Sequence, residues 1–171
     1  MQASVNAAIH FDQNQKYVFV SEFGYIPTPV GQGDSGSKPS NWLSREHYLR
    51  WQVNDEYFTY FGLTDKVFGI RILDHTAFSR DKTGNAQNDQ TYGVIVHKIQ
   101  TPYEFTGHLF MGNMTQEASV RQKGFSFMAE KDLTQYNRVG GTLLMSNNDF
   151  MQWVRLEGHN KIGFGKGNSL L

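Results

Sequence analysis

The stretch that decides the fold is residues 103–111, YEFTGHLFM. Its odd-numbered positions are apolar residues or glycine, and most positions between them are polar; the two sets are Tyr103, Phe105, Gly107, Leu109 and Met111 against Glu104, Thr106, His108 and Phe110. Successive side chains of a β-strand point to opposite faces of the sheet. This alternation therefore predicts a strand with one apolar and one polar face.

The same period of two recurs along most of the chain. The predicted strands are 3–11, 17–26, 43–53, 56–63, 91–100, 103–111, 124–131, 136–146 and 150–162. Turn signals such as Asn54-Asp55 separate several of them. We find no segment with a helical period and no domain linker. The sequence therefore predicts one all-β unit over residues 1–171, with about nine strands visible.

Three longer connections interrupt this pattern, at 27–41, 64–90 and 113–123. The connection 64–90 lies between two well-patterned segments and has no sustained period of its own. A loop this long in a β protein is either functional or disordered. Its apolar and aromatic content argues against disorder. We expect it to lie against or inside a barrel formed by the flanking strands.

Composition excludes several classes of protein. Sixteen basic and sixteen acidic residues give a net charge of zero, which argues against a nucleic-acid-binding protein. The chain has no cysteine, so it has neither a disulfide framework nor a thiolate metal site. No run approaches the ~20 apolar residues of a membrane helix. A β-barrel remains possible, because its strands carry their apolar face by alternation.

Three features favour a membrane barrel over a soluble one. Several predicted strands have the roughly 9–11 residues that cross a bilayer at a tilt, whereas soluble strands average about 5–6. Short turns alternate with long loops, except at 147–149, as in outer-membrane barrels. Aromatic residues gather beside the short turns, where an interfacial girdle would place them; they are Phe11, Tyr17, Trp51, Tyr57, Tyr103 and Tyr136. We therefore expect an antiparallel, up-and-down transmembrane β-barrel.

The expected strand count and direction indicate a fragment of a larger barrel. Bacterial outer-membrane barrels have an even number of strands and short periplasmic turns. The first visible strand would then run toward the periplasm, so at least one strand would precede it. The opening residues 1–5 lack the basic start and apolar core of a signal peptide. We expect this chain to be an internal piece of a longer barrel.

Several short motifs follow a familiar order. They are Phe61-Gly62-Leu63, Val67-Phe68-Gly69-Ile70-Arg71, Ala77-Phe78-Ser79-Arg80, Asp89-Gln90-Thr91-Tyr92-Gly93-Val94 and Leu109-Phe110-Met111-Gly112-Asn113. In this order the chain resembles the core of the phosphate-selective porin O and P family. The resemblance implies a trimeric outer-membrane channel with loops folded into its lumen. No row of basic residues matches the family's arginine and lysine ladder, so phosphate selectivity is not implied.

A pore selects through the charge and width of its narrowest point. If the loop 64–90 folds inward, the constriction candidates are Arg71, Asp74, His75 and Arg80. The same residues could equally form a salt-bridged loop that only plugs or stiffens the barrel. The polar strand faces supply the lumen-facing candidates, which are Glu46, Arg50, Glu104, Glu130, Arg138, Arg155 and Glu157. Their mixed signs indicate a solvated inner wall with weak ion preference.

We expect no metal, no cofactor and no catalytic residue. The histidines His10, His97, His108 and His159 fall on separate strands without ligand spacing. No nucleophile elbow or phosphate-binding loop is present, and the pair Glu157 and His159 is typical of any polar strand face. The chain is therefore predicted not to be an enzyme.

The leading functional hypothesis is a porin-like channel of the bacterial outer membrane. It would pass small hydrophilic solutes or ions, and its partners would be membrane lipid and further copies in a homotrimer. Two alternatives remain open. One is a soluble secreted β-barrel that binds an apolar ligand or a glycan. The other is a barrel that sheathes an electron-transfer partner.

Overall fold

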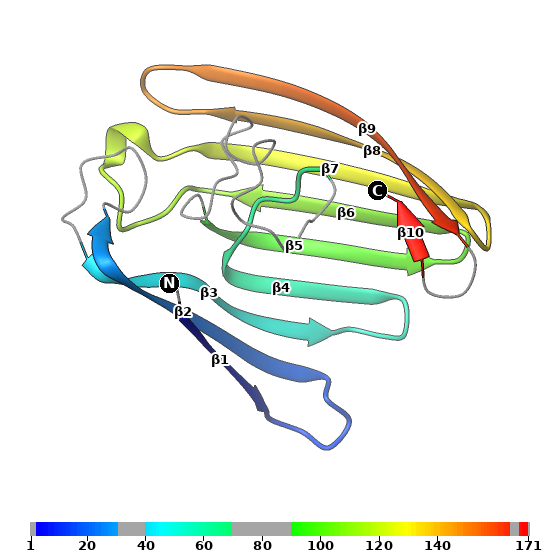
Figure 1. Cartoon of the computed structure of the whole chain (residues 1–171), viewed down its shortest axis with the longest axis horizontal. Coiled ribbons are helices and arrows are strands. Elements are labelled where there is room, and N and C mark those ends of the chain that lie inside the picture. The colour runs from blue at the N-terminus through cyan, green and yellow to red at the C-terminus, as the bar shows by residue number, and fades with distance from the viewer. Residues whose placement is uncertain (1–2, 31–39, 70–89, 165–167, 171) are drawn as a thin grey trace.

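The computed structural model describes residues 3–30, 40–69, 90–164 and 168–170 and shows one antiparallel sheet of ten strands (Figure 1). Strand order in the sheet is the order in the chain, β1 to β10, so every strand pairs with its sequence neighbours. The all-β, antiparallel, up-and-down class predicted from the sequence is confirmed. The count of about nine strands becomes ten, because residues 168–170 pair with β9 as a short additional strand.

The strands are long. They are β1 Ala3–His10, β2 Tyr17–Val30, β3 Ser40–Gln52, β4 Tyr57–Thr64, β5 Thr91–Gln100, β6 Tyr103–Phe110, β7 Lys123–Thr134, β8 Asn137–Asn147, β9 Gln152–Phe164 and β10 Asn168–Leu170. A single 3-10 turn, η1 Ala118–Val120, lies in the connection between β6 and β7. Five strands have 11 residues or more. These lengths exceed the soluble average of about 5–6 and match those of tilted membrane strands.

The predicted loop 27–41 is too long at both ends, because residues 27–30 belong to β2 and residues 40–41 belong to β3. Strand β2 continues to Val30 and β3 begins at Ser40, with Val30 opposite Ser40. The register is interrupted between Tyr25 and Val30. Proline lacks the N–H that a ladder needs and is found where pairing is broken. Pro27 and Pro29, read from the sequence as loop residues, therefore fit inside an irregular strand end.

The sheet is open. In the part of the chain that the structure describes, β1 pairs with β2 alone and β10 pairs with β9 alone. The curvature of the sheet is visible in Figure 1, where β1 and β9 form opposite margins. Closure into a barrel is not seen here and stays a prediction.

The two faces of the sheet differ in residue type. We call the face that carries Glu104, Thr106 and His108 the inner face, and the opposite face, which carries Phe105 and Leu109, the outer face. Register pairing extends both sets across the sheet, since Thr106 lies opposite Met128 and Leu109 lies opposite Phe125. The inner face is mainly polar, and the outer face is mainly aliphatic and aromatic.

Burial in this sheet is the reverse of that in a water-soluble sheet. On the inner face, His108, Thr142 and Glu130 are exposed by only 1%, 3% and 3%. On the outer face, Leu156 and Leu109 are exposed by 79% and 67%. A soluble antiparallel sheet buries its apolar face and wets its polar face. Here the polar face is the buried one, and apolar residues such as Leu144 and Ile95 are buried on that same face.

No second layer covers the outer face within the described residues. Each strand contacts only the strands next to it in the sequence. The described residues include no helix that is both long and apolar enough to cross a membrane. The large apolar side chains of the outer face therefore have no described protein segment packed over them.

Candidate functional site

The polar inner face is the candidate functional site, because it holds most of the buried polar side chains. Its most deeply buried polar members, each exposed by 4% or less, come from β5, β6, β7 and β8, and they are Thr91, Thr106, His108, Ser126, Glu130, Thr142 and Ser146. Alternation along each strand places them on one side. Such a face suits a water-filled lumen or a polar ligand.

All lumen-facing candidates from the sequence lie on this face. Strand β3 contributes Glu46 and Arg50, β6 contributes Glu104, β7 contributes Glu130, β8 contributes Arg138, and β9 contributes Arg155 and Glu157. The structure brings three of them together, since Arg138 Nη1 donates to Glu104 Oε2 at 2.6 Å and to Glu130 Oε2 at 3.2 Å. Arg155 instead lies over the ring of Trp153, 6.0 Å from its centroid.

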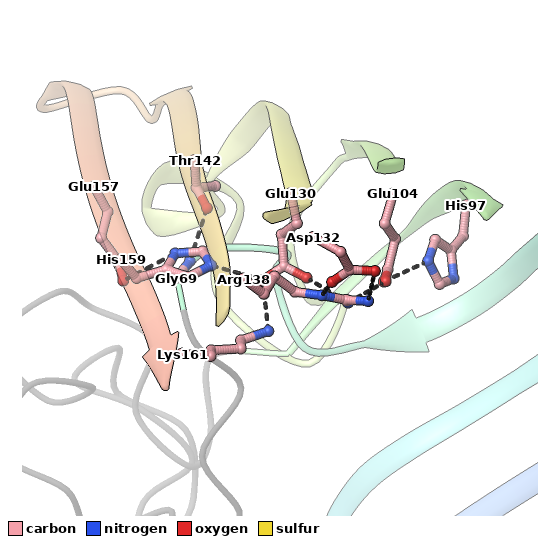
Figure 2. Close-up of polar contacts among 10 residues, drawn as sticks. All are labelled: Gly69, His97, Glu104, Glu130, Asp132, Arg138, Thr142, Glu157, His159 and Lys161. Carbon is pink, nitrogen blue, oxygen red and sulfur yellow. Dashed lines mark hydrogen bonds and ion pairs between the residues drawn. The ribbon is translucent and has the colours of Figure 1, made fainter. Parts of the chain in front are cut away.

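Arg138 is the centre of a charged network whose members come from β5, β6, β7, β8 and β9 (Figure 2). Its guanidinium also holds Asp132 through two hydrogen bonds, Nε to Oδ1 at 2.6 Å and Nη2 to Oδ2 at 3.1 Å. On the far side of Glu104, His97 Nε2 lies 2.8 Å from Oε1. The planar guanidinium suits this role, because it offers several donors in a fixed fork.

Glu130 forms the second half of the network. Its Oε1 lies 2.6 Å from His159 Nε2 and also accepts a hydrogen bond from Lys161 Nζ. The side chains of Glu130 and His159 are exposed by only 2% and 3%. A carboxylate so deeply buried needs several charged or polar partners. Arg138, His159 and Lys161 supply them.

Sequence reasoning missed four members of this network: His97, Asp132, His159 and Lys161 were not among the site residues. Parity could have found three of them, because Asp132 lies two residues from Glu130, and His159 and Lys161 lie two and four residues from Glu157 on the same strand. Strand β5 carries no candidate, so parity gives no signal for His97. The register between neighbouring strands determines which side chains come into contact, and it cannot be read from a single sequence.

The first residues of the connection 64–90 lie across the inner face. Val67 N–H donates to His108 Nδ1 at 3.3 Å, and Gly69 N–H donates to Thr142 Oγ1 at 3.2 Å. Val67 is almost completely buried. In Figure 1 this segment leaves β4 and crosses toward β7. We call residues 65–69 the inner segment.

Two side-chain contacts hold the beginning of the inner segment. Lys66 Nζ donates to Gln122 Oε1 at 2.8 Å, close to the start of β7. Asp65 accepts a hydrogen bond from Gln90 Nε2 at 3.1 Å, just before β5. A Cβ built on Gly69 would overlap the Glu157 carboxylate, and the φ of Gly69 is +66°. Glycine is therefore required where the backbone passes closest to β9.

The expectation that the loop 64–90 lies against the strands holds for its first residues. The constriction candidates Arg71, Asp74, His75 and Arg80 lie outside the described residues. Their assignment stays a prediction.

A cavity of about 140 Å³ opens on the inner face beside the network. Its wall comes from β3 to β7 and consists of Glu46, Tyr48, Tyr60, Thr64, Ile95, His97, Glu104, Thr106 and Met128. The rings of Tyr48 and Tyr60 meet edge to face, with centroids 5.7 Å apart. The cavity therefore has a mixed lining, in which the carboxylates of Glu46 and Glu104 lie beside apolar side chains such as Ile95. Among the described residues, no group of three or more possible ligands is arranged to hold a metal ion.

The outer face has one satisfied polar cluster, on β2 and β3. His47 Nδ1 lies 2.8 Å from Ser21 Oγ, and His47 Nε2 lies 2.7 Å from Ser44 Oγ. The alternation of β3 predicts Ser44 on the face opposite His47, and that prediction is wrong. The register shifts between the pairs of Ser21 and Phe23, so a bulge brings Ser44 and His47 to the same face.

Aromatic side chains of the outer face gather at the short-turn edge. Tyr17 and Trp51 stack with ring centroids 6.1 Å apart, and Tyr103 and Phe105 stack at 6.1 Å. Lys98 Nζ lies 5.4 Å from the centroid of Tyr57, and Lys131 Nζ lies 5.2 Å from that of Tyr103. Two of the aromatic residues that the sequence places beside short turns, Tyr17 and Trp51, are therefore in contact in the structure.

Comparison with family models, with curated proteins and with solved structures found no match to this chain. What the protein does must therefore be argued from the two faces of its sheet.

Proposed function

We propose that this chain forms part of the wall of a porin-like channel in the bacterial outer membrane, through which small hydrophilic solutes or ions diffuse passively. The observation that carries the proposal is the reversed burial of the sheet. Large apolar side chains such as Leu156, Leu109 and Val154 are exposed, whereas Glu130 and His108 are buried. A barrel in lipid needs an apolar exterior and tolerates a polar interior.

Burial of apolar surface contributes roughly 25 cal/mol for each Å² removed from water. The outer face exposes many such side chains across β1 to β9, and soluble monomers rarely expose contiguous apolar patches of more than a few hundred Å². Contact with lipid would remove the free-energy cost of exposing these apolar side chains to water. The backbone N–H and C=O groups of the paired strands already have hydrogen-bond partners, as a segment in lipid requires.

The inner segment supports a channel with a narrowed lumen. It lies on the polar face, held by His108 and Thr142, and Gly69 passes against Glu157. A segment on that side reduces the free cross-section of any lumen that the sheet encloses. The mixed charges of the surrounding network favour weak ion selectivity.

Planar bilayer recording tests the proposal. Purified protein should insert from detergent and give discrete, ohmic conductance steps. Insertion without conductance would contradict the channel and favour the alternative of a barrel that sheathes a partner. A protein that stays monomeric in buffer without detergent would contradict the membrane assignment altogether.

The inner segment provides a sharper version of the same test. Gly69→Ala introduces a side chain at positive φ against Glu157, so it should displace the segment and raise single-channel conductance. The matched control is Gly107→Ala on the outer face, where an added Cβ meets nothing within 4 Å. Equal conductance of the two variants and the parent protein would show that the inner segment does not narrow the pore.

A further inference from the structure

The outward-facing charges of the described strands are all lysines. They are Lys98, Lys123 and Lys131, placed by their register partners Tyr57, Asn147 and Tyr103. The carboxylates of the strands lie on the inner face, where they form the salt bridges of the described residues. None of these salt bridges includes Lys98 or Lys131. The two signs of charge are therefore segregated between the faces.

Lys98 and Lys131 share a second property, which Lys123 lacks. Each is the direct cross-strand partner of a tyrosine, Tyr57 or Tyr103, and lies over its ring. We call these four residues the tyrosine–lysine belt. All four lie within three residues of a short turn or a strand end, at the edge where Tyr17 and Trp51 stack.

The chemistry of the belt fits one kind of partner. An ammonium held over an aromatic ring keeps its charge directed outward while its stem covers apolar surface. Tyrosine is favoured at the headgroup level of a membrane, and lysine there attracts anionic lipid. Among the described strand residues, no carboxylate shares the outer face with Lys98 and Lys131.

We infer that the tyrosine–lysine belt binds the phosphates of anionic phospholipids at the short-turn edge of the sheet. This inference rests on the proposed membrane location and adds the lipid class and the residues that recognise it. Each phosphate would accept hydrogen bonds from one ammonium, with the paired tyrosine ring beside it at the boundary with the acyl chains.

Vesicle flotation tests the inference. Refolded full-length protein is mixed with vesicles of phosphatidylcholine alone or with one third phosphatidylglycerol, and the membrane-bound fraction is measured. The parent protein should prefer the anionic vesicles. Lys98→Gln with Lys131→Gln should lower that preference by about fivefold for each lysine. The arginine pair Lys98→Arg and Lys131→Arg should restore it, because arginine also stacks on tyrosine.

Lys123→Gln is the matched control, since it removes an outward lysine that has no tyrosine partner, at the opposite edge. It should leave most of the preference in place. If the double glutamine variant and the parent protein bind both vesicle types equally, the belt does not select lipid, although membrane insertion still stands. If neither protein enters either vesicle, the proposed membrane location is wrong and the lipid site is wrong with it.

Discussion

The two faces of the same strands follow opposite rules. On the inner face, charged side chains such as Glu130 and Arg138 are linked to one another, and Glu130 is buried. On the outer face, apolar side chains such as Leu156 and Val154 are exposed one beside the next. Both faces belong to the same backbone, so their difference in residue type and burial reflects what each face contacts. This difference supports the proposal that the outer face contacts lipid and that the inner face contacts water or polar protein.

The largest effect is expected for Glu130→Ala, which tests the inner face. It removes the buried carboxylate that holds Arg138, His159 and Lys161 together. Removing one partner from a buried charge cluster typically costs about 3–5 kcal/mol. Urea unfolding in lipid vesicles should show a loss of that order. Asp132→Asn is the control, because Asp132 is partly exposed and solvent screens its pair with Arg138, so this variant should lose much less stability.

Leu156→Arg tests the other face. Leu156 is the most exposed of the large apolar residues. In a water-soluble protein, a charge at such a position would change stability by about 0.5 kcal/mol or less. At the midplane of a bilayer, it should cost about 2–4 kcal/mol. Asn160→Arg is the control, because Asn160 lies two outward positions closer to the strand end, and it should cost less stability. Equal, small losses of stability for both variants would mean that the outer face lies in water.

Thr142→Val tests whether the inner face holds the inner segment in place. The substitution keeps the side-chain shape and removes the hydroxyl that accepts from Gly69 N–H. A buried N–H left without its acceptor costs about 1–3 kcal/mol. Limited proteolysis within residues 65–69 should accelerate. Unchanged cleavage would mean that the hydrogen bond does not hold the segment.

The smallest effect is expected in the turn between β1 and β2, outside the strands. Asp12 accepts a hydrogen bond from Tyr17 N–H at 3.1 Å, which holds the pKa of its carboxyl below the ordinary value. A lowered pKa adds stability above the unfolded value of about 3.9, and this stability is lost as pH falls through the folded value. Asp12→Asn should therefore lower the melting temperature slightly at pH 7 and leave it unchanged near pH 2.

Sequence reasoning recovered most of the fold because period-two patterning is local. The strands 91–100 and 103–111 are found within one residue of their ends, since polar and apolar residues alternate cleanly there. Strand β2 could not be assigned a face, because Tyr17 to Ile26 is apolar on nearly every position. Its pairing with β3 settles this, placing Val18 inward and buried and Phe23 outward.

The site was recovered only in part. Parity placed Glu104, Glu130 and Arg138 on one face, and the structure joins them. The contacts of His159 and Lys161 with Glu130 depend on the register between strands, which cannot be read from a single sequence. The bulge that brings Ser44 beside His47 has no sequence signal for the same reason. The constriction candidates from Arg71 to Arg80 stay predictions.

Single-tryptophan fluorescence tests the central claim most directly. Trp51 lies on the outer face near the short turns, whereas Trp153 lies opposite Ser146 on the inner face. Two variants, one retaining only Trp51 and the other only Trp153, are reconstituted in vesicles with brominated acyl chains. We predict strong quenching of Trp51 by the brominated lipid and weak quenching of Trp153, which aqueous acrylamide should quench instead. Equal quenching of both by acrylamide, with none by the lipid, would contradict the account.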